Sequence, residues 1–149
     1  MPSQAEAKRH LRVTVIATTQ EGTLAALRTA RNLARDLELQ LALVSVKVVP
    51  YHFPVEAPPV SISFLTHHAL TLVAASGAKP EETTLQVYLC RDRTQCLRQV
   101  LAPNSLVVVG GRKRWWVGQE QKLETYLRTL GHRTIFAEMN SSSGCNLNF

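Results

Sequence analysis

Hydrophobic residues follow two alternating patterns along this chain. Five short runs, at residues 13–18, 41–49, 84–90, 105–109 and 134–138, predict β-strands. The runs at 13–18, 41–49 and 105–109 are rich in β-branched residues and almost continuously apolar. That composition is typical of parallel strands covered on both faces, so we expect a parallel sheet between two layers of helices.

Helical periodicity fills the gaps between these runs. Hydrophobic residues recur every three or four positions at 27–37, 62–73, 94–101 and 123–130. Thr18 with Glu21 predicts a capping box at the start of the first helix. Gly77 with Pro80, and later Gly131, predict where the second and fourth helices end.

The strict alternation of strand and helix predicts a three-layer α/β/α sandwich with a five-stranded parallel sheet. In such sheets, ligands bind beyond the carboxyl ends of the strands, where the strand order reverses. Two loops therefore form the candidate site: residues 18–22 after the first strand and residues 110–118 after the fourth.

Length and composition favour a single domain. With 149 residues, 45% of them hydrophobic and 19% charged, the chain can bury a core without disulfides or metals. We expect the domain at 11–139, after a flexible lead-in at 1–10 and before a polar tail at 140–149. The sequence has no apolar run long enough to span a bilayer and no hydrophobic secretory signal, so we expect a cytoplasmic protein.

The formal charge of +6 favours anionic partners. Nucleic acid is not the favoured partner, because no recognition motif accompanies the charge. His67 and His68 are adjacent and point to different sides of a helix, which does not suit a metal ion. Cys90 and Cys96 are expected to be small buried hydrophobic residues rather than metal ligands or a disulfide.

The loop after the fourth strand carries the most distinctive residues. Gly110 and Gly111 would let the backbone approach a ligand closely. The cations that follow could hold an anion; they are Arg112, Lys113 and Arg114. No pair of carboxylates lies in the two loops with an evident nucleophile, and no catalytic motif is present, so we assign no catalytic residue and do not expect an enzyme.

Trp115 and Trp116 are the most unusual pair in this loop. They could stack on a base, but packing of the loop or contact with a partner protein is favoured.

Two segments resemble universal stress proteins. VTVIATTQEGTLAALRTARNLARDLELQLALVSV, from Val13, resembles their opening strand, helix and strand. YLCRDRTQCLRQVLAPNSLVVVGG, ending at Gly111, resembles their third strand, third helix and fourth strand. The resemblance extends over residues 13–138. It implies the strand order 3-2-1-4-5, a role in stress response, and a homodimer formed through the fifth strand with Ile135 at the interface.

The resemblance also implies a site for ATP or another nucleotide, with departures from the family pattern. In that family, an aspartate after the first strand helps to hold the adenosine, and a loop of pattern GxxGx9G[S/T] cradles the phosphates. Here Thr18 occupies the aspartate position, and Lys113 replaces the second glycine. Gly118 could match the third glycine, but it lies closer to Gly110 than the pattern requires. Gln119 replaces the serine or threonine that ends the pattern. The candidate site comprises Thr18, Thr19, Gly110, Gly111, Arg112, Lys113, Arg114, Gly118 and Gln119.

The sequence therefore predicts a non-catalytic regulatory domain of universal stress type, with a degenerate site for an adenine nucleotide or another anion. The alternative is an interaction module that binds no ligand and docks a partner, such as a transporter or a sensor, through the basic loop. An open cleft between the two loops would favour a ligand. A cleft filled by Trp115 or Trp116 would favour the interaction module.

Overall fold

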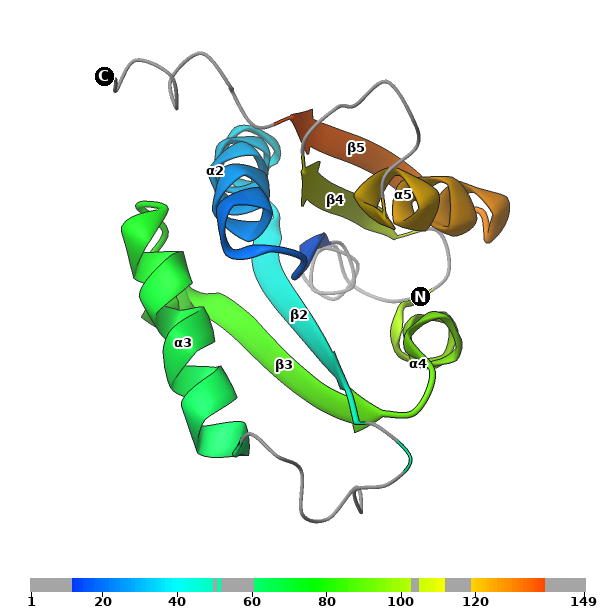
Figure 1. Ribbon diagram of the computed structural model, residues 1–149. Helices are drawn as coiled ribbons and strands as arrows, with labels where there is room; N and C mark the ends of the chain where they lie inside the picture. The colour runs from blue at the N-terminus through cyan, green and yellow to red at the C-terminus, as the bar shows by residue number, and fades with distance from the viewer. Residues whose placement is uncertain (1–11, 50, 52–60, 103–104, 112–118, 139–149) are drawn as a thin grey trace, which may run out of the picture.

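The structure, a computed structural model, describes residues 12–49, 51, 61–102, 105–111 and 119–138. Its strands are β1 (Arg12–Ile16), β2 (Gln40–Val48), β3 (Thr83–Cys90), β4 (Leu106–Gly111) and β5 (Arg133–Glu138). Its helices are α2 (Gln20–Leu37), α3 (Ile62–Ala75), α4 (Arg93–Val100) and α5 (Gln119–Thr129), with a 3₁₀ turn η1 at Pro80–Glu82. All the strands and helices expected from the sequence are present (Figure 1).

The strands form one sheet in the order β3-β2-β1-β4-β5, and every neighbouring pair is parallel. At its centre, Val15 of β1 pairs with Leu43 of β2 on one side and with Val108 of β4 on the other. The predicted fold is therefore confirmed, including the strand order that the family resemblance implies.

Helices cover both faces of the sheet: α2 and α3 lie on one face, and α4 and α5 on the other (Figure 1). Because successive side chains of a strand point to opposite faces, each central strand supplies both cores. Val15 packs beneath α2 and α3, whereas its neighbour Ile16 packs beneath α4 and α5. This double burial explains why the central strands are apolar at nearly every position.

The start of α2 differs from the prediction. Thr19, not Thr18, caps the helix, and its Oγ1 accepts a hydrogen bond from the backbone N–H of Gly22 at 3.0 Å. The capping box is therefore wrong by one residue: the position that would hold the reciprocal glutamate is Gly22, and Glu21 lies one place too early. The predicted stops at Gly77 and Gly131 are confirmed, because both residues adopt a positive φ, of 90° and 92°, just after α3 and α5.

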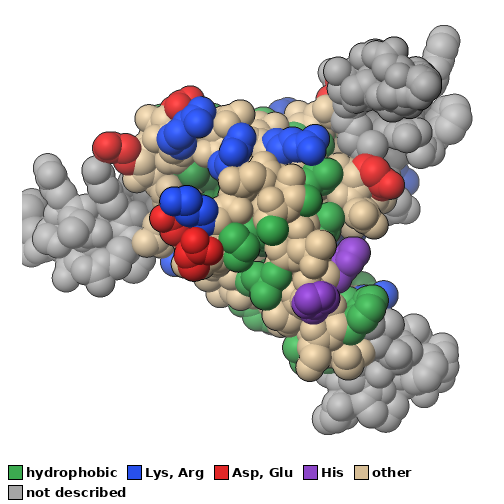
Figure 2. Space-filling view, turned by 90° about the vertical axis from the view of Figure 1, so that its left-hand side faces the viewer, with side chains coloured by type: hydrophobic (Ala, Val, Ile, Leu, Met, Phe, Trp, Pro, Cys, Tyr) green, Lys and Arg blue, Asp and Glu red, His purple; other side chains and the backbone are tan. Residues whose placement is uncertain are grey.

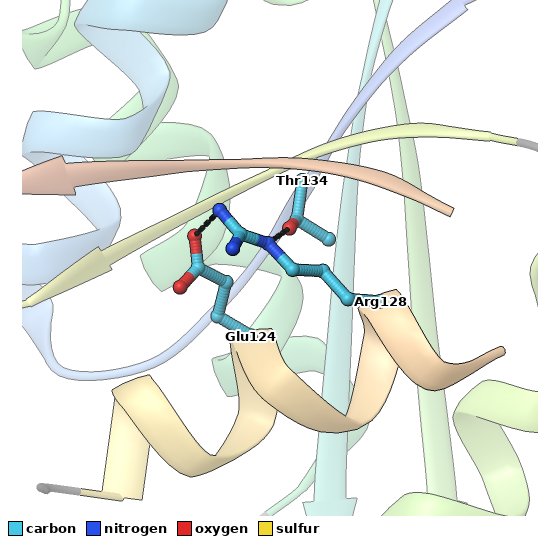
Figure 3. A network of polar contacts seen from close by, with 3 residues as sticks. All are labelled: Glu124, Arg128 and Thr134. Atoms are coloured by element: carbon cyan, nitrogen blue, oxygen red, sulfur yellow. Dashed lines mark hydrogen bonds and ion pairs between the residues drawn. The ribbon is translucent and has the colours of Figure 1, made fainter. Parts of the chain in front are cut away.

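Polar contacts hold the terminal strand β5 in place. Arg128 of α5 donates from Nε to Oγ1 of Thr134 at 2.8 Å and from Nη2 to Oε2 of Glu124 at 3.2 Å (Figure 3). His132 accepts at Nδ1 from the backbone N–H of Ser105, at 3.1 Å. Burial lowers the pKa of His132, which keeps the ring neutral and able to accept that bond.

Candidate binding cleft

The loop after β1 touches the end of β4. Oγ1 of Thr18 donates a hydrogen bond to the carbonyl oxygen of Gly110 at 2.9 Å. The backbone N–H of Thr18 donates to Oγ1 of Thr23, also at 2.9 Å. The hydroxyl group of Thr18 therefore makes its donated hydrogen bond within the protein, where it joins the two candidate loops.

The first turn of α2 also packs directly on the backbone of β4. A Cβ atom built at Gly110 would lie 1.9 Å from the carbonyl oxygen of Gly22, and one built at Gly22 would lie 2.5 Å from the carbonyl oxygen of Gly110. Neither position has room for a side chain. The structure thus gives Gly110 a packing role opposite α2, between the two candidate loops.

An open cleft lies on the β2 side of this contact. Its volume is about 570 Å³, and it lies between the loop after β1, the end of β2, the helix α3 and the first residue of α4. The floor comes from alternate residues of β2, namely Leu43, Ser45 and Lys47. Because side chains alternate along a strand, these three share the face that α3 covers.

Two cations reach the cleft, and no carboxylate does among the lining residues that the structure describes. Lys47 comes from β2 and Arg93 from the start of α4. Nη2 of Arg93 donates to the carbonyl oxygen of Ala17 at 3.1 Å, which ties α4 to the end of β1. Thr19 and Gln20 place the amino end of α2 at the same cleft. The partial positive charge of that helix end adds to the field of the two cations.

The α3 side of the cleft is mostly apolar. Leu65, Ala69 and Leu72 line it together with His68. The ring of His68 is stacked parallel to that of Phe64, with centroids 6.3 Å apart. On the molecular face shown in Figure 2, histidine side chains lie beside hydrophobic ones at one end, and most lysine and arginine side chains gather at the other.

The structure separates the residues that the sequence suggested for the site. Thr18 and Thr19 line the cleft, whereas Gly110 and Gly111 are buried at the end of β4. Gln119 begins α5, and Ile135 is half-buried in β5 against the core beneath α2. The remaining suggested residues lie outside the described part of the chain: Arg112, Lys113, Arg114, Trp115, Trp116 and Gly118.

Of the residues that line the cleft, the sequence suggested only Thr18 and Thr19; the polar residues that it missed include Ser45, Lys47, His68 and Arg93. Ser45 and Lys47 did leave a signal, because they are the polar positions in the otherwise apolar run 41–49 and share one face. His68 and Arg93 left none, because only the packing of α3 and α4 brings them to the end of β1.

The described residues contain no group of three or more His, Cys, Asp or Glu side chains that could hold a metal ion. In the same residues, no helix combines the length and apolar character needed to cross a bilayer.

Comparison with known proteins agrees with the fold. The structure of a universal stress protein from Archaeoglobus fulgidus matches with a TM-score of 0.53 at 12% identity, over 86% of this chain and 98% of that one. Two more matches are the universal stress protein from Archaeoglobus fulgidus in complex with dAMP and a universal stress protein in complex with cAMP. Their TM-scores are 0.49 and 0.48, at 12% and 13% identity, over 86% and 87% of this chain and 98% of each of theirs. The match at a TM-score of 0.53 shows that the chain has the fold of universal stress proteins. No family model and no curated protein matches the sequence.

Proposed function

We propose that the cleft binds a nucleotide or a similar organic anion weakly, and that the chain is a non-catalytic regulatory domain of universal stress type. The observation that carries this proposal is the cleft itself. Its volume of about 570 Å³ falls in the range of small-molecule sites, roughly 300–1,000 Å³. It lies beyond the carboxyl ends of parallel strands, where α/β proteins bind their ligands.

The two kinds of lining suit a ligand with an apolar part and an anionic part. Leu65, Ala69 and Leu72 offer apolar surface to a base or another flat ring. Lys47, Arg93 and the amino end of α2 offer positive charge to a phosphate or carboxylate. An uncharged ligand would gain less from the second group than an anion would, so the anion is the more distinctive part of the proposal.

Binding is proposed to be weak because the cleft lacks a partner for the nucleoside. The described lining residues include no carboxylate that could accept hydrogen bonds from the nucleoside. The hydroxyl group of Thr18 already donates its hydrogen bond to the carbonyl oxygen of Gly110. Each missing hydrogen bond to a charged partner costs about 1.5–3 kcal/mol, which is about tenfold or more in affinity. The same lack of carboxylates leaves the described cleft without a general base of that kind, so we propose binding rather than catalysis.

Amide chemical shifts should locate the ligand. When AMP is titrated into ¹⁵N-labelled protein, we expect shifts at Ala17–Thr19, at Ser45–Lys47 and at His68, because these residues line the cleft. Adenosine, which lacks the phosphate, is the matched control and should produce smaller shifts at equal concentration. Shifts confined to the amino ends of the strands, around Arg31 and Lys79, would place binding elsewhere and contradict the proposal.

We also propose that two copies associate through β5. This strand ends the sheet order, so one of its edges has no neighbouring strand within the described chain. Exposed strand edges are usually paired or covered, and a second copy would do this by extending the sheet. Light scattering at micromolar concentration should then give twice the 16.6 kDa mass of one chain. A single-chain mass at that concentration would rule out the dimer.

A further inference from the structure

A second hollow lies toward the amino ends of the strands, away from the candidate cleft. Its volume is about 860 Å³, which falls in the range of roughly 300–1,000 Å³ for small-molecule sites. Thr14, Ala42 and Val44 line its floor together with Gln86. The register of the sheet places Thr14 beside Ala42 and Val44 beside Gln86. Val44 belongs to the core beneath α4 and α5, so these four residues share the face that those helices cover.

Most of the remaining lining is aliphatic. Leu37 and Leu39 come from the carboxyl end of α2, and Val100 and Leu101 from the carboxyl end of α4. The side chain of Leu37 is 53% exposed, an unusual state for a large hydrophobic residue. None of the described lining residues is aromatic. An alkyl chain placed against this surface would remove it from water, which is favourable.

Two arginines also reach the hollow. Arg12 is the first residue of β1, and Arg133 is the first residue of β5. Two hydrogen bonds of Ser105 hold the backbone at Arg133: its N–H donates to Nδ1 of His132 at 3.1 Å, and its carbonyl oxygen accepts from the N–H of Arg133 at 3.0 Å. The described lining residues include no carboxylate. The charge of this hollow therefore favours an anion.

The hydroxyl of Thr14 gives a further indication of a ligand. The side chain of Thr14 is 4% exposed, and no residue in the described part of the chain forms a hydrogen bond with its hydroxyl. A buried polar group without a partner is costly and uncommon. Arg12 lies two residues earlier on the same strand and faces the same side. One carboxylate near the start of β1 can therefore accept hydrogen bonds from both side chains.

We propose that this hollow binds an aliphatic carboxylate of medium length, such as decanoate. The alkyl chain lies against the leucine and valine side chains, and the carboxylate accepts hydrogen bonds from Arg12 and Thr14. Arg133 adds a second positive charge. The proposal does not rest on the nucleotide proposed for the cleft, because the two sites share no described lining residue.

Titration of decanoate into the ¹⁵N-labelled full chain tests the proposal. We expect amide shifts at Thr14, Ala42 and Gln86, and almost none at Thr18 and His68, which line the cleft instead. 1-Decanol has the same chain without the charge and should bind about tenfold more weakly, because it loses the charged hydrogen bonds. Equal affinity for the two compounds, or shifts confined to Thr18 and His68, would overturn the proposal.

A matched pair of arginine variants tests the role of charge. Arg12→Gln should weaken decanoate binding about tenfold, measured by calorimetry. Arg28→Gln, at an exposed position of α2 outside the hollow, makes the same change in net charge and should leave the affinity unaltered. Equal losses of affinity in the two variants, or none in either, would show that decanoate does not use this hollow.

Thr14→Val separates binding from stability. It keeps the shape of the side chain and removes the hydroxyl, so decanoate should bind about tenfold more weakly. The midpoint of urea unfolding should stay the same or rise, because the lost hydroxyl has no partner in the described chain. A lower midpoint with unchanged affinity would show that the hydroxyl serves the fold and not a ligand, and would contradict the proposal.

Discussion

Replacing Gly110 with alanine is expected to lower the free energy of unfolding by about 3 kcal/mol, near the upper end for overpacking a core. The added Cβ would lie 1.9 Å from the carbonyl oxygen and 2.8 Å from the carbonyl carbon of Gly22. Both are backbone atoms, so no side chain can rotate away, and α2 must shift from β4. That shift would also strain the hydrogen bond from Thr18 to Gly110.

Two other substitutions in α2 make this prediction specific. Gly22→Ala places a Cβ 2.5 Å from the carbonyl oxygen of Gly110 and should also destabilise, although alanine is the better helix former by about 1 kcal/mol. Asn32→Ala, at an exposed position of the same helix, should change stability by less than about 0.5 kcal/mol. Urea unfolding gives each value from the shift of the midpoint. If Gly110→Ala were as stable as the wild-type protein, the backbones of α2 and β4 would not approach as closely as the structure shows.

The fold was predictable from the sequence because short stretches of residues indicate most of its strands and helices. Runs such as Val107–Val109 are apolar on both faces, which is typical of a parallel strand covered on both sides. Alternation of strands and helices then limits the topology. The strand order itself came from the family resemblance, since periodicity does not distinguish one order from another.

The site was less predictable because it depends on packing. Thr18 and Thr19 follow a strand and could be placed at its carboxyl end, and both line the cleft. His68 and Arg93 reach the cleft only because α3 and α4 pack where they do. The sequence could likewise not show that the hydroxyl group of Thr18 donates a hydrogen bond to the carbonyl oxygen of Gly110, a residue far along the chain.

A single change of charge tests the account of the cleft. Lys47 supplies one of the two cations there, and Lys47→Gln keeps much of its length while removing the charge. We expect AMP to bind about tenfold more weakly, because a hydrogen bond between charged partners contributes about 1.5–3 kcal/mol. Lys122→Gln, at an exposed position of α5, makes the same change in net charge and should leave the affinity almost unaltered.

Calorimetric titration of these proteins with ATP, AMP and sulfate, at low and at physiological salt, tests the central claim most directly. The account predicts dissociation constants of about 0.1–1 mM for wild-type protein, or roughly −4 to −5.5 kcal/mol, weakened by salt and by Lys47→Gln but not by Lys122→Gln. Tight ATP binding that neither salt nor Lys47→Gln reduces would contradict the account. So would an AMP affinity that Lys47→Gln leaves unchanged, because Lys47 would then not hold the anion.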